Sequence, residues 1–533
     1  MPSLARVFLL ILAIFSVTAQ AGVRLLVDSD RETLLEVTAG PLQKTVVTRQ
    51  GTPHTEIRLE GFDFQAGMGK PETPYLTARL LVPHGGDFRY EIVSRKPAQA
   101  VALLYDVSYA AEVPAHDGRH RLAQKDDDAY ALSYGRDLVE VEEVGFTGKD
   151  KILALRFWPI RYDAKARKLS LTPDFKIRVT YSATKTGVAA NADGIARYLV
   201  LNTATIKERA SSRKFDLLVA HSSYEMDLFR LVEFKVTRGR KVKTLFVDGK
   251  SADQVKALIK AEYQAAEPPT QTLLIGSMTQ IPAFPGSGEN YWTDYDYQVL
   301  DNDGIPDISV GRIPAANSID LRNAVDKIIA RELEPRQVQN ILITSGQDTS
   351  MGCPANVTRV GENLKAAGND VKVVKRFRTE VSTEEVIAGY NDNPNIVVYD
   401  GHGNREGMME VPLTLSNLNK LTNNAFPIIL DIACLNANWT SSANWRNFTA
   451  GILFQERRGV AGIMASGGSG DGHAFFRSIG QIMADARKNL ANDTKMNEVG
   501  QVILAAKIKN GQQDRTYWNY YGDPATSVWE STY

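Results

Sequence analysis

The pattern of apolar and polar residues changes near Arg213, and this change constrains the fold more than any other feature. Beyond it, short and almost wholly apolar runs alternate with stretches of helical periodicity, among them 318–334 and 497–511. Such runs are typical of strands buried on both faces, as in parallel sheets covered by helices. The segment therefore predicts a doubly wound α/β region, built on one parallel sheet or on two side by side. The strand candidates are KFDLLVAH, KVKTLFVD, TLLIGS, DISVGRIP, QNILITSG, VKVVKRF, NIVVYDGHG, FPIILDIAC and VAGIMASG.

The preceding half of the chain has a different pattern, with apolar and polar residues alternating over much of 22–183. The stretch 151–183 shows this alternation broken by turn-forming residues, which is typical of a β meander. We therefore expect an all-β unit over 22–183. Residues 184–213 are small and polar and carry a basic cluster, so they are predicted to form an exposed linker with a processing site.

The first 21 residues have the layout of a cleavable signal peptide. Arg6 precedes an apolar run from Val7 to Val17, and Ala19-Gln20-Ala21 forms a small-residue end. The apolar run is shorter than the roughly 20 residues that a membrane-spanning helix requires. We expect an exported protein, periplasmic, secreted or associated with the cell surface, with no stable membrane span.

The overall charge gives no reason to expect a nucleic-acid partner, because 62 basic residues are matched by 62 acidic ones. Only two cysteines are present, Cys353 and Cys434, and they either pair or remain free thiols. Two cysteines do not make a disulfide scaffold, so ordinary cores must stabilise the chain. Five histidines, His54, His84, His116, His120 and His221, show no spacing typical of zinc ligands.

A histidine and a cysteine end two of the predicted strands. His402 lies between Gly401 and Gly403 after NIVVYD, and Cys434 closes FPIILDIAC at a distance that suits one strand–helix–strand crossover. Because chemistry collects at the carboxyl ends of parallel strands, Cys434 is a candidate nucleophile and His402 its general acid and base. The N–H groups of Gly403 and Cys434 are candidates for an oxyanion hole. Alternatively, Cys434 is a small buried apolar residue and His402 belongs to an ordinary turn.

These residues carry a family resemblance. VVYDGHGN and IILDIAC resemble the histidine and cysteine blocks of the gingipain-type cysteine peptidases, family C25, relatives of the caspases and legumains. The Asp-rich stretch 291–315 and the closing YYGDPATSVW resemble further blocks in the same order. The resemblance implies a caspase-like catalytic region of two subdomains, 214–337 and 338–533. It also implies that 22–183 is a propeptide that inhibits its own enzyme, and that the substrate is a protein or peptide.

Some positions depart from the family pattern. Family members that are specific for Arg or Lys place an acidic residue in the pocket that receives the basic side chain. Thr358 stands at the equivalent position here, so specificity for Arg or Lys is in doubt. The third catalytic acid should follow ITSG, where Asp348 can serve only if the loop shifts by one residue; otherwise Asp348 is a solvated loop acid. The stretch 467–475 ends another strand and is predicted to line the substrate cleft. It contains Asp471, the nearby acid, Gly472, and His473, which we expect to be a cleft or surface histidine.

The segment DYDYQVLDNDGIPD concentrates carboxylates around Gly304, and such oxygen ligands suit Ca²⁺. The resemblance points to Asp303 and Asp307 as ligands, while a solvated acidic turn is the alternative. Cys353, in the loop DTSMGCPAN, has no partner base visible in the sequence, so we expect it to fill space or line the cleft.

Three functions fit these residues. The first is an exported cysteine endopeptidase that is made as a zymogen and works through a Cys434 thioester. The second is a transpeptidase of the same fold, in which an amine rather than water attacks the thioester. The third is an inactive surface-assembly or binding protein that retains the fold.

Overall fold

The computed structural model describes most of the chain between Gly22 and Trp529. The predicted signal peptide and nearly all of the predicted linker lie outside the described residues. The described ranges are 22–65, 69–83, 87–109, 112–114, 120–122, 124–131, 133–134, 137–147, 150–183, 200–202, 214–286, 291–334, 339–346, 353–368, 371–376, 382–411, 413–439, 447–468, 472–488, 495–510 and 516–529.

The described residues up to Ser182 form small antiparallel sheets, with the orders β1-β2-β16-β7, β11-β14-β15-β8, β12-β13-β6-β5, β3-β4 and β10-β9. Alternate residues of β2 and β16, such as Leu35 and Ile177, are buried because one face of their sheet packs on a core. The strands are β1 (Gly22–Asp28), β2 (Glu32–Thr38), β3 (Leu42–Arg49), β4 (Thr52–Leu59), β5 (Asp63–Gln65), β6 (Thr73–Leu81), β7 (Phe88–Arg95), β8 (Gln99–Ala102), β9 (Glu112–Pro114), β10 (His120–Leu122), β11 (Ser133–Tyr134), β12 (Val139–Thr147), β13 (Asp150–Phe157), β14 (Ile160–Asp163), β15 (Lys168–Leu171) and β16 (Asp174–Tyr181), with one short helix α1 (Asp127–Ala131).

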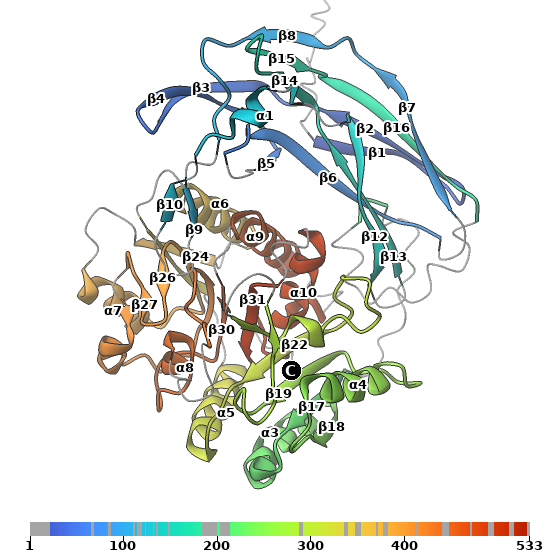
Figure 1. The fold of residues 1–533 in the computed structure, drawn as a ribbon. Helices are drawn as coiled ribbons and strands as arrows, with labels where there is room; N and C mark the ends of the chain where they lie inside the picture. The colour runs from blue at the N-terminus through green and yellow to red at the C-terminus, as the bar shows by residue number, and fades with distance from the viewer. Residues whose placement is uncertain are drawn as a thin grey trace, which may run out of the picture.

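The second half is built on a single ten-stranded sheet with the order β18-β17-β19-β22-β31-β30-β29-β25-β23-β24. Figure 1 shows this sheet with its helices below the N-terminal strands. Its strands are β17 (Phe215–Ala220), β18 (Lys241–Phe246), β19 (Gln271–Ile275), β22 (Ser309–Ile313), β23 (Gln339–Ser345), β24 (Val371–Arg376), β25 (Ile396–Asp400), β29 (Ile428–Ile432), β30 (Gly462–Ser466) and β31 (Trp518–Gly522).

Helices cover both faces of the sheet, which confirms the doubly wound prediction. Consecutive residues of β25 show why: Val397 belongs to the apolar cluster that contains residues of α3, α5, α7 and α8, and Val398 belongs to the cluster that contains residues of α6, α9 and α10. The central strands are therefore mostly apolar. The helices are α3 (Glu225–Thr237), α4 (Ala252–Tyr263), α5 (Ser318–Leu333), α6 (Cys353–Lys365), α7 (Thr383–Asn391), α8 (Phe448–Leu453), α9 (His473–Lys488) and α10 (Val499–Lys509), with the short 3-10 helices η3 (Ser222–Tyr224), η4 (Tyr295–Tyr297) and η6 (Lys495–Asn497).

The sheet differs from the prediction in its centre, where β31 joins the two predicted subdomains into one sheet. This strand pairs parallel with β22 and antiparallel with β30. Gly462 permits the close pairing, since a Cβ there would lie 2.0 Å from the Tyr520 hydroxyl. The alternative of two separate sheets is therefore wrong, and the sheet is mixed rather than wholly parallel.

The crossover between β25 and β29 also differs from the predicted strand–helix–strand unit. Its described part is a small antiparallel sheet followed by a 3-10 helix, and it contains no α-helix. The three strands are β26 (Gly403–Asn404), β27 (Gly407–Met408) and β28 (Leu413–Thr414), the helix is η5 (Leu415–Lys420), and a separate pair is formed by β20 (Phe284–Pro285) and β21 (Trp292–Thr293).

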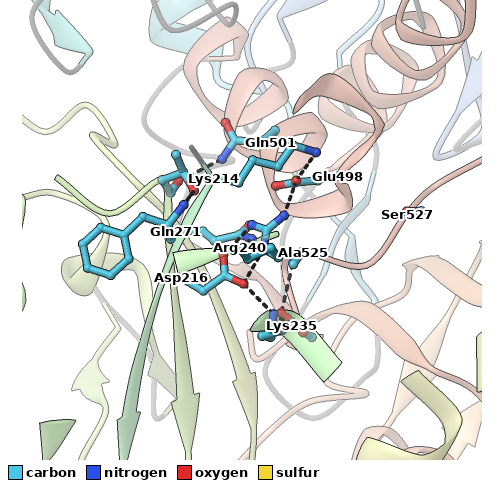
Figure 2. A network of polar contacts seen from close by, with 12 residues as sticks. Lys214, Asp216, Lys235, Arg240, Gln271, Glu498, Gln501, Ala525 and Ser527 are labelled. Atoms are coloured by element: carbon cyan, nitrogen blue, oxygen red, sulfur yellow. Dashed lines mark hydrogen bonds and ion pairs between the residues drawn. The ribbon is translucent and has the colours of Figure 1, made fainter. Parts of the chain in front are cut away.

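A buried ionic network ties the first strand of the large sheet to the end of the chain (Figure 2). Asp216 of β17 accepts hydrogen bonds from Lys235, at 2.8 Å, and from Arg240. Arg240 also contacts Glu498, at 2.8 Å, and Lys235 contacts Asp523, at 2.5 Å. Burial raises the pKa of Asp216, but the charges of Lys235 and Arg240 outweigh this effect and keep it below its usual range. The network therefore holds β17 and α3 to the segments that flank α10 and β31.

Within the described residues, the helices are too short or too polar to cross a membrane.

We predict that Asp216→Ala lowers the free energy of unfolding by about 3–5 kcal/mol, because it leaves buried cations without their central carboxylate. The matched control is Asp326→Ala, which breaks an exposed ion pair with Arg230 and should lower it by about 0–1 kcal/mol. Urea denaturation measures both, and equal effects of the two changes would contradict this account.

Candidate functional site

The pairing of β25 with β29 brings His402 and Cys434 to the same edge of the sheet. The strands are parallel neighbours, and Asp400 stands opposite Ile432. His402 lies two residues beyond Asp400, and Cys434 lies two residues beyond Ile432, the residue that pairs with Asp400. Gly403 lets the two loops touch, since a Cβ there would lie 2.6 Å from the Ala433 Cβ atom and 2.9 Å from the Cys434 carbonyl oxygen. Both side chains are half-buried.

A sharp turn after Cys434 presents its side chain at the strand end. Leu435 has a φ of 63°, a left-handed conformation that is rare for a residue with a branched side chain. Its N–H donates to the Gly468 carbonyl at 3.2 Å, and the Ala437 N–H donates to Ser466 at 2.9 Å. The loop after β30 thus fixes the turn, in keeping with strained backbone at functional sites.

The backbone of His402 is held on both sides. The Tyr399 hydroxyl donates to the His402 carbonyl oxygen at 2.7 Å, and the Met409 N–H donates to the same oxygen at 2.9 Å. The His402 N–H donates to the Glu410 carboxylate at 3.0 Å. This carboxylate fills the space above Gly346, where a Cβ would lie 1.6 Å from it. Glu410 therefore occupies the end of β23, where the sequence predicts a third acid.

A neutral acid lies beneath the Cys434 loop. Asp431 of β29 is fully buried and accepts a hydrogen bond from the Asn436 amide at 2.7 Å. Burial raises the pKa of Asp431 to about 8, so this carboxyl is largely protonated at neutral pH. It therefore adds little negative charge to the interior next to Asn436.

Cys353 has titratable neighbours that the sequence does not reveal. It is the first residue of α6 and lies with His473, the first residue of α9, and Asp400, the last residue of β25. Each of the three residues has one donor atom, sulfur, nitrogen or oxygen, and these three atoms lie within 4.8 Å of one another. His473 Nδ1 is 3.0 Å from the Asp400 carboxylate. The expectation that Cys353 lacks a partner base is therefore wrong. Neither Cys353 nor Cys434 forms a disulfide.

The predicted cleft residues are only partly described. Thr358 is half-buried on α6. Gly472 is buried, and a Cβ there would lie 2.5 Å from Trp518, which explains the need for glycine. Asp348 and Asp471 lie outside the described residues. The roles of these four residues, like the catalytic and oxyanion roles of His402, Gly403 and Cys434, stay predictions.

The Asp-rich loop is a tight turn made by its own carboxylates. Asp303 Oδ1 accepts from the Ile305 N–H, and Asp307 Oδ2 accepts from the Leu300 N–H, each at 2.7 Å. Burial first, and the carboxylates of Asp301 and Asp303 next, raise the pKa of Asp307 to about 7. Carboxylate oxygens are the ligands that Ca²⁺ takes in proteins, and calcium at this loop stays a prediction.

The model of peptidase family C25 matches residues 210–529. Because this match covers more than half of the chain, the chain belongs to peptidase family C25. The resemblance that the sequence motifs indicate is thereby confirmed.

Among curated relatives, a gingipain R1 of Porphyromonas gingivalis is 21% identical over 91% of this chain and 52% of its own length. A gingipain R2 of the same organism is 22% identical over 91% of this chain and 70% of its own length. The chain thus spans about half of the length of that gingipain R1.

Solved structures show the same fold at low identity. The Arg-specific cysteine proteinase gingipain R aligns at 20% identity with a TM-score of 0.53, over 60% of this chain and 79% of its own. A complex of the pro- and mature domains of RgpB from Porphyromonas gingivalis aligns at 20% identity with a TM-score of 0.52, over 60% and 81%. These likenesses support the caspase-like α/β fold.

We predict that Glu410→Ala lowers kcat of a peptidase assay by roughly 10- to 100-fold with KM little changed, as for other groups that orient a working histidine. Glu410→Gln keeps an acceptor for the His402 N–H and should restore most of the activity. Glu406→Ala, an exposed change in the same hairpin, is the matched control. Full activity of Glu410→Ala would show that His402 needs no such support.

Proposed function

We propose that this chain is an exported cysteine endopeptidase made as a zymogen, with Cys434 as nucleophile and His402 as general acid and base. The observation that carries the proposal is the register of β25 and β29, which places both residues at the same offset beyond a matched pair. Membership of a peptidase family supports the same reading. Export rests on the signal-peptide pattern of residues 1–21.

In the proposed reaction, the His402 imidazole takes the proton of the Cys434 thiol, and the sulfur attacks the carbonyl carbon of the scissile peptide bond. The N–H groups of Gly403 and Cys434 stabilise the negative oxygen that forms. The C–N bond then breaks as His402 protonates the leaving amine. Water, deprotonated by His402, cleaves the thioester, releases the carboxylate product and restores the thiol.

Substrate choice is proposed to reside in the cleft formed by α6 and the loop after β30. Thr358 offers a hydroxyl where a family member that prefers basic residues offers a carboxylate, so an exclusive preference for Arg or Lys is not expected. Asp471 is the one acid of the predicted cleft loop that can attract a basic side chain.

The N-terminal half packs against the proposed catalytic region. Ile152 of β13 shares an apolar cluster with Ile305 of the Asp-rich loop and with helices α6, α9 and α10. Gly145 of β12 is close to Ile305, since a Cβ there would lie 2.2 Å from its Cδ1 atom. This contact supports the proposal that the N-terminal half is a propeptide that stays bound to the catalytic region, and inhibition is the further part of that proposal.

Calcium is proposed as a structural ion at the Asp-rich loop, where Asp303 and Asp307 would supply oxygen ligands. A bound cation would neutralise carboxylates that otherwise repel one another. Because Ile305 of this loop contacts the N-terminal half, such an ion would also stabilise the contact between the two halves.

We predict that Cys434→Ala abolishes peptide hydrolysis, and that His402→Ala lowers kcat by about two to four orders of magnitude, as loss of acid–base catalysis implies. A thiol-reactive peptide probe followed by mass spectrometry should label Cys434 in the wild type. Asp326→Ala is the matched surface control. Full activity after either active-site change would refute the mechanism, and products joined to an added amine would identify a transpeptidase instead.

The zymogen proposal predicts a cut between Thr184 and Arg213, because proteases cut unpacked polar segments far more readily than folded elements. Cleavage would turn an intramolecular inhibitor into a separate one that is lost by dilution. Intact-mass analysis of the exported protein, with and without Cys434→Ala, measures the cut. A fully active enzyme that still carries its N-terminal half would contradict the proposal, and a cut in both forms would assign processing to another protease.

The calcium proposal predicts that added calcium raises the melting temperature of the wild type, since a ligand that binds only the folded state stabilises it. Asp303→Ala combined with Asp307→Ala should remove this response. Thermal unfolding with chelator and with calcium provides the measurement. A wild type whose melting is indifferent to both would show that the ion is absent.

A further inference from the structure

We propose that Cys353, Asp400 and His473 form a binding site for a thiophilic divalent metal ion, with Zn²⁺ as the best fit. The three residues come from separate elements, the first turns of α6 and α9 and the last residue of β25. Their donor atoms lie within 4.8 Å of one another.

The donor set selects the metal. One sulfur, one imidazole nitrogen and one carboxylate oxygen are the ligands that Zn²⁺ takes in proteins, whereas Ca²⁺ requires six to eight oxygens. Ligands bonded to Zn²⁺ at about 2.0–2.3 Å lie roughly 3.3–3.8 Å apart in a tetrahedron. The 3.0 Å separation of His473 Nδ1 from the Asp400 carboxylate is close to that range. Small side-chain shifts would therefore admit the ion, with a fourth position left for water or another ligand.

Burial and charge favour the same conclusion. Cys353 and Asp400 are each 1% exposed, and the side chain of His473 is 13% exposed. When the ion binds, Cys353 releases its thiol proton, and the resulting thiolate and the Asp400 carboxylate together carry two negative charges. A divalent cation with a neutral imidazole makes the cluster electrically neutral.

The scaffold around the cluster is rigid, as a metal site requires. Helices α6 and α9 pack closely, since a Cβ at Gly480 would lie 2.8 Å from the Val360 side chain. An ion would tie the first residues of both helices to β25. His402 follows Asp400 by two residues, so the ion would also steady the strand end that carries the proposed catalytic histidine.

The test uses the full chain with Cys434→Ala, in which Cys353 is the remaining cysteine. After removal of metal with a chelator, Co²⁺ is added as a spectroscopic substitute for Zn²⁺. We expect a thiolate-to-cobalt charge-transfer band that saturates at one ion per chain, together with the visible bands of a tetrahedral ion. Zn²⁺ should abolish both by displacement and should raise the melting temperature.

The matched variant is Cys353→Ser in the same background, which should lose the charge-transfer band and bind Zn²⁺ at least about 10- to 100-fold more weakly. Asp400→Asn should weaken binding while the band remains. Circular dichroism checks that each variant is folded. A folded Cys434→Ala protein without the band, or the same band in Cys353→Ser, would overturn the proposal. Neither outcome depends on peptidase activity, so its failure is distinguishable from failure of the proposed function.

Discussion

The parallel pairing of β25 with β29 is the constraint on which the rest of the site depends. Side chains at equal offsets beyond a matched pair in neighbouring parallel strands lie at one edge of the sheet, about 4.8 Å apart in the strand-to-strand direction. Asp400 opposite Ile432 sets this register, and His402 and Cys434 follow from it. A slip of one residue would turn one of them to the opposite face of the sheet.

The loops beyond that edge are held by small residues and by polar contacts of the backbone. Gly403 allows the histidine loop to touch the cysteine loop, and Glu410 holds the His402 N–H from beneath. Leu435, in a left-handed conformation, turns the chain away directly after Cys434. Backbone interactions thus hold both loops that carry the proposed dyad.

The sequence predicts much of the fold because fully buried parallel strands are continuous apolar runs, and all nine predicted runs are strands of the large sheet. It does not predict β31, since WNYYG is short and carries a polar Asn519 among aromatic residues. The length of the crossover after His402 suits an α-helix, but glycine and proline within GNREGMMEVP disfavour a helix and allow a small sheet.

The proposed dyad can be found from the sequence because both members end recognisable strands. The role of Glu410 and the proximity of Cys353 to His473 cannot be found in this way. They depend on how the hairpin packs onto β23 and on where two helices begin, and no local pattern encodes these tertiary relations. Glu410 is a case in point, because it reaches the end of β23 through a tertiary contact at Gly346, whereas Asp348 lies outside the described residues.

The central claim is that His402 and Cys434 act as a pair, and the pH dependence of Cys434 alkylation tests it most directly. Alkylation is followed at the Cys434 peptide by mass spectrometry in the wild type and in His402→Ala. The account predicts that the wild-type thiol reacts at pH values well below the roughly 8.5 of a free thiol, and that the profile moves toward that value in the variant. Superimposable profiles for the two proteins would contradict the pairing.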